Sequence, residues 1–153
     1  MKSYGFPLFS PEREIVIENV RSDRNTGTYA LGGRSGFFTI YVPGGTSVAA
    51  RYSGIVTNVI PPRTQETSYA APLIEDEIHS MGILEILTDD SVLVQHVHVL
   101  SSLSVGDRVT DNVPIARVAG YCVLIRDHFH VAFFDRKDGR PLDLLFRELQ
   151  STR

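Results

Sequence analysis

The sequence predicts an all-β domain of the sandwich or barrel type, built as an antiparallel sheet. Three observations support this class. Short runs rich in β-branched and aromatic residues recur along the chain, turns rich in Gly, Pro, Asn and Asp separate them, and helix-like apolar spacing occurs only near the end. Because the chain has 153 residues and shows no compositional boundary, we expect a single domain covering 1–153.

Three runs in the first half of the chain have the composition of strands: 14–20, 37–42 and 54–60. A Pro-Gly-Gly turn at 43–45 follows the second run. The segment 61–80 is different, since it begins with two prolines, lacks a strand or helix period and carries acidic residues at Glu75, Asp76 and Glu77. We predict that it is a long loop or inserted arm, and the most irregular part of the chain.

In the second half, the runs 82–87 and 91–100 are expected to form a hairpin across a turn at 88–90. A tight turn begins at 105–109, and 114–118 returns as a short strand. Two further strands are expected at 121–126 and 128–134. Apolar residues recur at a helical spacing only between Leu142 and Leu149.

Composition excludes several classes of function. The formal net charge is -3 and there is no basic block, so the chain lacks the electrostatic footprint of a nucleic-acid-binding protein. Cys122 is the only cysteine, which excludes an internal disulfide and a cysteine-built zinc site. Neither a membrane-spanning run nor the apolar core of a signal peptide occurs. We therefore expect a cytoplasmic location, unless the chain is trimmed or is exported by another route.

Histidines mark the candidate site. Four of the five occur as two spaced pairs, His96 with His98 and His128 with His130, each inside a strand-forming run. Side chains alternate along a strand, so both rings of a pair are expected on one face, and two adjacent strands would gather four imidazoles. Such a patch can bind a metal, move protons or carry a phosphoryl group. A lone strand histidine is more often structural, but two matched pairs favour a shared site.

The order of the short motifs resembles that of the lysostaphin/LytM-type zinc endopeptidases, which have the duplicated hybrid motif fold. The resemblance spans nearly the whole chain, although each motif by itself is weak. The matching motifs are Phe6-Pro7-Leu8, 43–50 (PGGTSVAA), Gly54-Ile55-Val56, His98-Val99-Leu100, 105–109 (VGDRV), Pro114-Ile115-Ala116, 128–133 (HFHVAF) and 139–143 (GRPLD).

The resemblance implies a function and a role for three histidines. Members of that family use one zinc ion to cut peptide cross-links of bacterial cell walls. By position, His130 resembles a zinc ligand, whereas His98 and His128 resemble the catalytic histidines that polarise the attacking water and stabilise the tetrahedral intermediate. These roles are chemically consistent, because zinc lowers the pKa of bound water to about 7 and an adjacent imidazole can transfer the proton.

The chain departs from the family pattern at the other two zinc ligands, a histidine and an aspartate four residues later. Two alignments place Arg34 and Phe38, or Ser35 and Thr39, at these positions. Neither offers an imidazole or a carboxylate, so one expected ligand remains and no zinc cofactor is expected. The loop at 120–127 is also bulky and apolar where the family has Gly and Ser, which indicates a filled groove.

Three functions therefore compete. The first is a non-catalytic relative of the peptidoglycan endopeptidases with a binding or assembly role, its partner a peptidoglycan peptide or a protein. The second is an active metallohydrolase whose zinc site recruits His96 as an extra ligand, with a carboxylate from 75–77; it would require zinc. The third is a histidine phosphocarrier of the glucose phosphotransferase type, using His79 with His96 or His98. The first is favoured, so the chain is expected not to be an enzyme.

Overall fold

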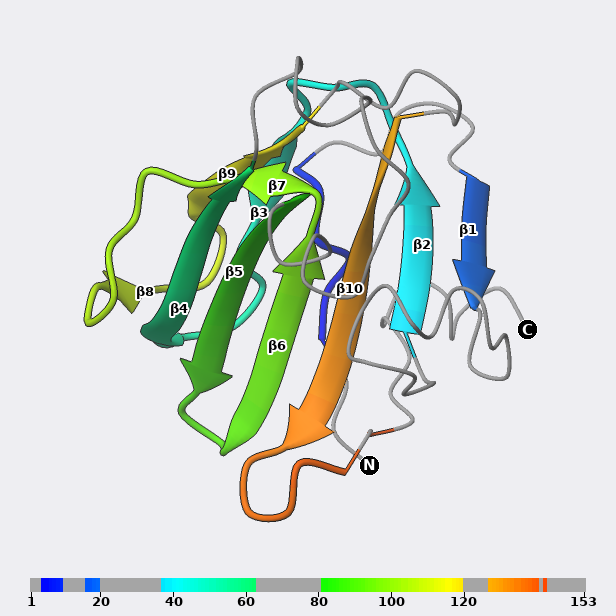
Figure 1. The fold of residues 1–153 in the computed structure, drawn as a ribbon. Coiled ribbons are helices and arrows are strands. Elements are labelled where there is room, and N and C mark those ends of the chain that lie inside the picture. The colour runs from blue at the N-terminus through cyan, green and yellow to red at the C-terminus, as the bar shows by residue number, and fades with distance from the viewer. Residues whose placement is uncertain are drawn as a thin grey trace.

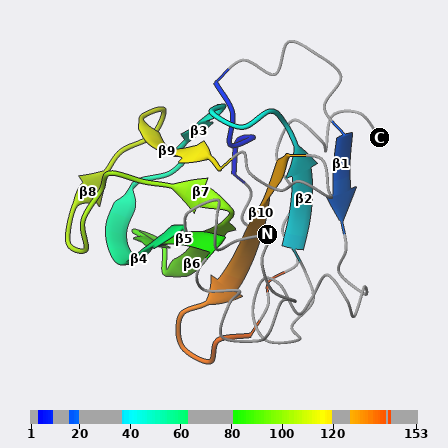
Figure 2. The same cartoon turned by 45° about the horizontal axis from the view of Figure 1, so that its top comes forward.

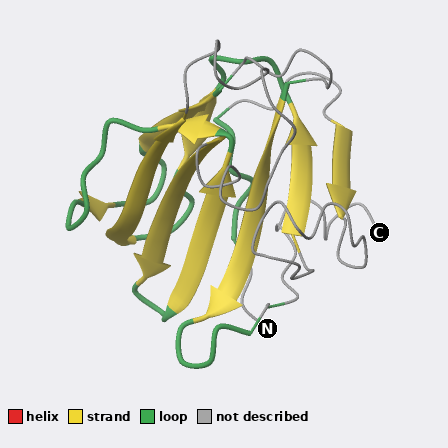
Figure 3. Ribbon diagram, in the orientation of Figure 1, coloured by secondary structure: helices red, strands yellow, loops and turns green. Residues whose placement is uncertain are grey.

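The computed structural model describes residues 4–9, 16–19, 37–62, 81–119, 127–140 and 142. All regular elements in these ranges are β-strands, which confirms the all-β class predicted from the sequence (Figure 3). No helix in these ranges is long and apolar enough to cross a membrane. Three predicted features lie outside the described residues: the arm beyond Pro62, the strand at 121–126 and the helix-like stretch after Leu142.

Seven strands form a curled antiparallel sheet, a half-barrel (Figure 1). The last strand in sequence, β10, occupies an interior position between β2 and β6, so strands from both halves of the chain are joined through it. In spatial order the strands are β1 (Val16–Asn19), β2 (Phe37–Tyr41), β10 (His128–Asp135), β6 (Val92–Val97), β5 (Met81–Thr88), β4 (Gly54–Pro62) and β8 (Arg108–Val109).

A second sheet of three short strands lies across one end of β4, β5 and β6 (Figure 2). Its order is β3 (Ser47–Ala49), β9 (Pro114–Val118) and β7 (Val99–Leu100), again antiparallel. The chain passes from the large sheet to the small one between β6 and β7. Both sheets contribute side chains to one apolar core, which therefore lies between them.

The core side of the large sheet is set by the alternation of side chains along each strand. On β10, Phe129, Val131 and Phe133 belong to the apolar core cluster and are at most 2% exposed. Full burial of such a side chain stabilises the fold by about 1.5–3 kcal/mol. The intervening residues His128 and His130 consequently face away from this core.

The N-terminal segment 4–9 packs against both sheets. Leu8 forms a single β-bridge with Val48, and the ring of Tyr4 stacks on that of Phe133 with 5.7 Å between ring centres. Burying these side chains covers one side of the core, which gives the apolar motif near the start of the sequence a structural role.

The hairpin expected across 88–90 is confirmed, since β5 and β6 pair in antiparallel register from Ile83 opposite Val97 to Leu87 opposite Leu93. The run 91–100 is not one strand, however. It divides at His98, and its two parts belong to different sheets. This division shapes the candidate site.

Candidate functional site

Three histidine rings meet at the junction of the two sheets. His98, His128 and His130 each offer a ring nitrogen, and these atoms all lie within 4.8 Å of one another. The ring centres are 4.8 Å apart for His98 and His128, 4.9 Å for His128 and His130, and 5.0 Å for His98 and His130. The arrangement is nearly an equilateral triangle, so a single ion could contact all three rings.

The cluster is buried. The exposed fractions of His98, His128 and His130 are 4%, 6% and 2%. Burial penalises the charged imidazolium, and the neighbouring histidines add repulsion, so the pKa of His130 lies well below its usual value. Its ring is therefore neutral near pH 7, and a neutral imidazole is the form that binds a metal.

Strand β10 supplies two of the three rings. The single residue between His128 and His130 places both on the face opposite the core, as the spacing predicts. Pairing fixes their position along the sheet: His130 lies opposite Val97 of β6 on one side and opposite Thr39 of β2 on the other.

His98 reaches the same place by an unusual backbone conformation. Its φ is 69°, in the left-handed region that residues other than glycine adopt in only a few per cent of cases. The conformation ends β6, redirects the chain into β7 and turns the His98 ring toward β10. Two backbone hydrogen bonds hold it: His98 N–H donates to Gly82 O (2.8 Å), and Ala119 N–H donates to His98 O (2.9 Å).

Gly82 makes this conformation possible. Its φ is +92°, and a Cβ added to it would lie 2.1 Å from the carbonyl oxygen of Val99. Only glycine lets the backbone next to His98 approach β5 so closely. Sequence reasoning took Gly82 merely as the first residue of a strand. An isolated glycine in a strand pattern is a signal for close backbone approach.

Asp127 precedes the histidine pair, but its carboxylate is engaged elsewhere. Asp127 Oδ2 accepts a hydrogen bond from the backbone N–H of Gly44 at 2.8 Å. The bond joins the start of β10 to the Pro43–Gly45 turn, two of the segments that carry the family resemblance. No carboxylate belongs to the histidine cluster among the described residues.

His96 does not join the cluster. It lies opposite Val131, on the core side of the sheet, and is 1% exposed. The left-handed conformation at His98 breaks the alternation that would have placed both rings on one face. The four-imidazole patch expected from the sequence is thus a cluster of three in the described part of the chain.

The hydrogen bonds of His96 are those of a structural residue. Its Nδ1 lies 3.0 Å from Leu84 O, which can only accept, so Nδ1 carries the proton. Nε2 is then left to accept from the Tyr52 hydroxyl at 3.4 Å. Burial lowers the pKa of His96 to about 4 despite the bond to Leu84. A ring so enclosed is inaccessible to a phosphoryl donor.

The substituted ligand positions of the family are only partly described. Phe38 is 3% exposed and belongs to the apolar core, so this position faces away from the histidines. The backbone of Thr39 is instead the direct partner of His130. The register therefore favours the alignment that places Thr39 at the aspartate position. Arg34, Ser35, His79 and the acidic run 75–77 lie outside the described residues.

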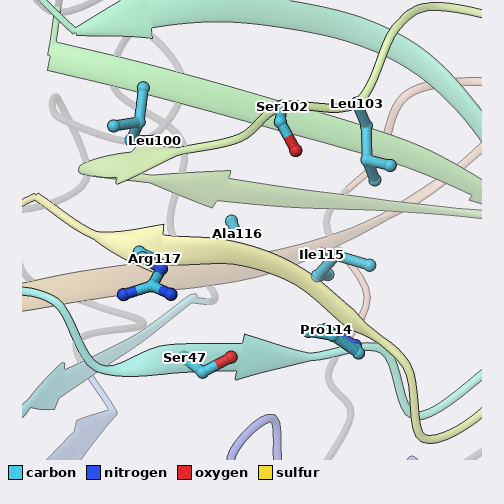
Figure 4. Close-up of a pocket in the computed structure, with 8 residues that line it drawn as sticks. All are labelled: Ser47, Leu100, Ser102, Leu103, Pro114, Ile115, Ala116 and Arg117. Carbon is cyan, nitrogen blue, oxygen red and sulfur yellow. The ribbon is translucent and has the colours of Figure 1, made fainter.

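A separate pocket of about 330 Å³ lies on the three-stranded sheet (Figure 4). Neither histidine nor carboxylate lines it, so it provides a contact surface but no acid–base pair. The lining residues are Ser47, Leu100, Ser102, Leu103, Pro114, Ile115, Ala116 and Arg117.

Comparison with solved structures places this architecture among known folds. A zinc-containing peptidase from Vibrio cholerae superposes with a TM-score of 0.59 at 19% identity, over 92% of this chain and 39% of that one. The catalytic domain of the prophage-encoded M23 protein EnpA from Enterococcus faecalis gives 0.58 at 17%, over 92% and 94%. The fold is that of the LytM-type peptidases.

The LytM-type fold also occurs in the SpoIIQ–SpoIIIAH pore-forming complex, which matches with a TM-score of 0.57 at 15% identity over 93% of this chain and 88% of that one. At these identities the likeness concerns the fold alone. No family model and no curated protein matches the sequence. The chain spans well under half of the Vibrio cholerae protein.

The histidine cluster is compatible with the zinc ion that several LytM-type structures imply. Imidazole nitrogen is a good ligand for zinc, and three protein ligands are the usual number at a catalytic zinc. Three imidazoles on one tetrahedral zinc would place their ring centres about 5 Å apart. The observed separations of 4.8–5.0 Å agree, and rotation of the rings would bring the nitrogens together.

Proposed function

We propose that this domain is a non-catalytic relative of the LytM-type peptidoglycan endopeptidases and acts by binding or assembly. The observation that carries the proposal is the composition of the cluster: three buried imidazoles and no carboxylate among the described residues. Family chemistry requires zinc ligands and, in addition, separate imidazoles that move protons and stabilise the intermediate. Three rings cannot fill both sets of positions.

Each way of using the three rings loses one half of the chemistry. If His98 and His128 stay free as proton carriers, His130 alone remains to hold the metal, which is too few ligands for tight binding. If all three ligate, the described cluster keeps no general base or acid. The fold thus retains the position of the peptidase site without its full set of groups.

Burial adds a second argument. A peptide cross-link must bring its carbonyl carbon within about 3–3.5 Å of the attacking group. His98, His128 and His130 are at most 6% exposed, so the centre of the cluster is closed to a polymeric substrate. Presence of the same fold in the SpoIIQ–SpoIIIAH complex supports an assembly role, since the fold there occurs in a protein complex.

The test is a hydrolysis assay on dye-labelled peptidoglycan, with zinc added to saturation. We expect the wild-type protein to release no more dye than His130→Ala. His96→Gln serves as the matched control, because it alters a buried histidine on the opposite face of the sheet. Zinc-dependent release by the wild-type protein and His96→Gln, abolished in His130→Ala, would overturn the proposal.

An active metallohydrolase is the second candidate, and the near-equilateral triangle of rings favours it. Three imidazoles with a bound water are a known catalytic zinc arrangement. Positive hydrolysis of small activated esters with failure on peptidoglycan would indicate this function. It requires that the cluster open to solvent, which burial of the three rings opposes.

A further inference from the structure

We infer that His98, His128 and His130 together ligate one late first-row divalent ion, zinc or a close neighbour, in a closed structural site. This inference deepens the proposed function, since it makes His98 and His128 ligands where the resemblance implies proton carriers. From the sequence alone, one expected ligand remained and no metal was expected. The structure raises the number of converging imidazoles to three.

Geometry is the first support. A metal at the centre of three imidazoles needs their nitrogens about 3.4 Å apart at tetrahedral zinc distances. The ligand atoms lie within 4.8 Å of each other, and the ring centres already have nearly equal separations of 4.8–5.0 Å. Closing the site requires ring rotation and no movement of strands.

The backbone provides the second support. Backbone strain that the surrounding structure maintains is concentrated at functional sites. His98 adopts the left-handed conformation between two sheets, where Gly82 and Ala119 fix its peptide groups by hydrogen bonds. Ser91 and Asn112, which share this φ of 69°, lie in turns that join consecutive strands. His98 instead aims its ring at the other two histidines.

Donor type decides the class of ion. Nitrogen ligands favour zinc, copper, nickel and cobalt, whereas calcium and magnesium require oxygen. A bound ion would join β10 to the point where the chain passes from the large sheet to the small one. Its role is therefore to hold the two sheets together, as structural zinc does in small domains.

The first experiment is calorimetric titration of the metal-free full chain with Zn²⁺, then Co²⁺, with Mg²⁺ as the negative probe. We expect one Zn²⁺ per chain, a higher melting temperature with Zn²⁺, and no response to Mg²⁺. Absence of stoichiometric Zn²⁺ binding, or equal binding of Mg²⁺, overturns the inference.

Single substitutions then count the ligands. We expect His98→Asn, His128→Asn and His130→Asn each to weaken Zn²⁺ binding by more than about 100-fold, because loss of even an outer-shell partner costs 10–100-fold. His96→Gln should bind as the wild type does, since that ring lies on the opposite face. Weakening by His130→Asn alone would return His98 and His128 to the roles that the resemblance implies.

A measurement on the wild-type chain covers the case in which a variant does not fold. Imidazole ¹⁵N chemical shifts, recorded before and after one equivalent of Zn²⁺, identify the ligating nitrogens directly. We expect large shifts for His98, His128 and His130 and none for His96. Shifts confined to His130, or to no member of the cluster, overturn the inference. Peptidoglycan hydrolysis by the loaded protein would refute the proposed function and leave the ligand count standing.

Discussion

Replacing Gly82 by alanine should disturb the histidine cluster through the backbone. The new Cβ would lie 2.1 Å from Val99 O, whereas such contacts essentially never fall below 3.0 Å, so the two strands must separate by about 0.9 Å. The left-handed conformation costs an alanine about 1–2 kcal/mol. Loss of the hydrogen bond from His98 to Gly82 costs about 1 kcal/mol more. We expect the free energy of unfolding to fall by about 3 kcal/mol.

Gly106→Ala is the matched control, because Gly106 has a φ of +96° and its added Cβ would meet no atom within 4 Å. It should lose only the conformational cost of about 1–2 kcal/mol. Urea denaturation followed by far-UV circular dichroism gives both values, since the chain has no tryptophan. Zinc affinity should fall in Gly82→Ala and stay unchanged in Gly106→Ala. Equal losses of stability, or an unchanged zinc affinity in Gly82→Ala, would refute the role assigned to Gly82.

Three further predictions concern single side chains. Below pH 6.5 the unfolded chain binds a proton at His96 that the folded protein does not bind until about pH 4, so stability should fall on acidification across this range. The loss should reach roughly 3 kcal/mol and be absent in His96→Gln, as urea titrations at several pH values would reveal. Thr39→Asp adds a carboxylate at the position paired with His130 and should raise zinc affinity about tenfold or more; calorimetry showing no gain contradicts the alignment. Phe129, fully buried, should cost about 3–5 kcal/mol on replacement by Ala, and a urea midpoint near that of the wild type would argue against its place in the core.

Strand composition and turn residues were sufficient to predict most of the sheet. The run 37–42 became β2, 54–60 became the longer β4, and 128–134 became β10 with one more residue. These segments have strong local signals because β-branched and aromatic side chains pack well on a pleated surface. Pairing between distant strands, such as β10 between β2 and β6, has no such local signal.

The candidate site was predictable on β10 and only partly elsewhere. The spacing of His128 and His130 fixes their common face, because alternation is a property of any regular strand. The same rule gave the wrong result for His96 and His98, since it assumes an unbroken strand and His98 has a φ of 69°. A histidine in the left-handed region leaves no trace in composition. Its cause lies in the close approach of Gly82, fourteen positions or more away along the hairpin.

The interior position of β10 has a consequence for the order of folding. Within the seven-stranded sheet, β10 is the link between β1–β2 and the strands from β4 to β8, and its partners β2 and β6 come from distant parts of the chain. Pairings over such sequence separations are slow, because the loop must close before its contacts form. Two of the three cluster histidines arrive with this strand. The cluster therefore completes only when the last pairing closes the sheet, so an ion captured there would trap the finished fold rather than guide its earlier steps.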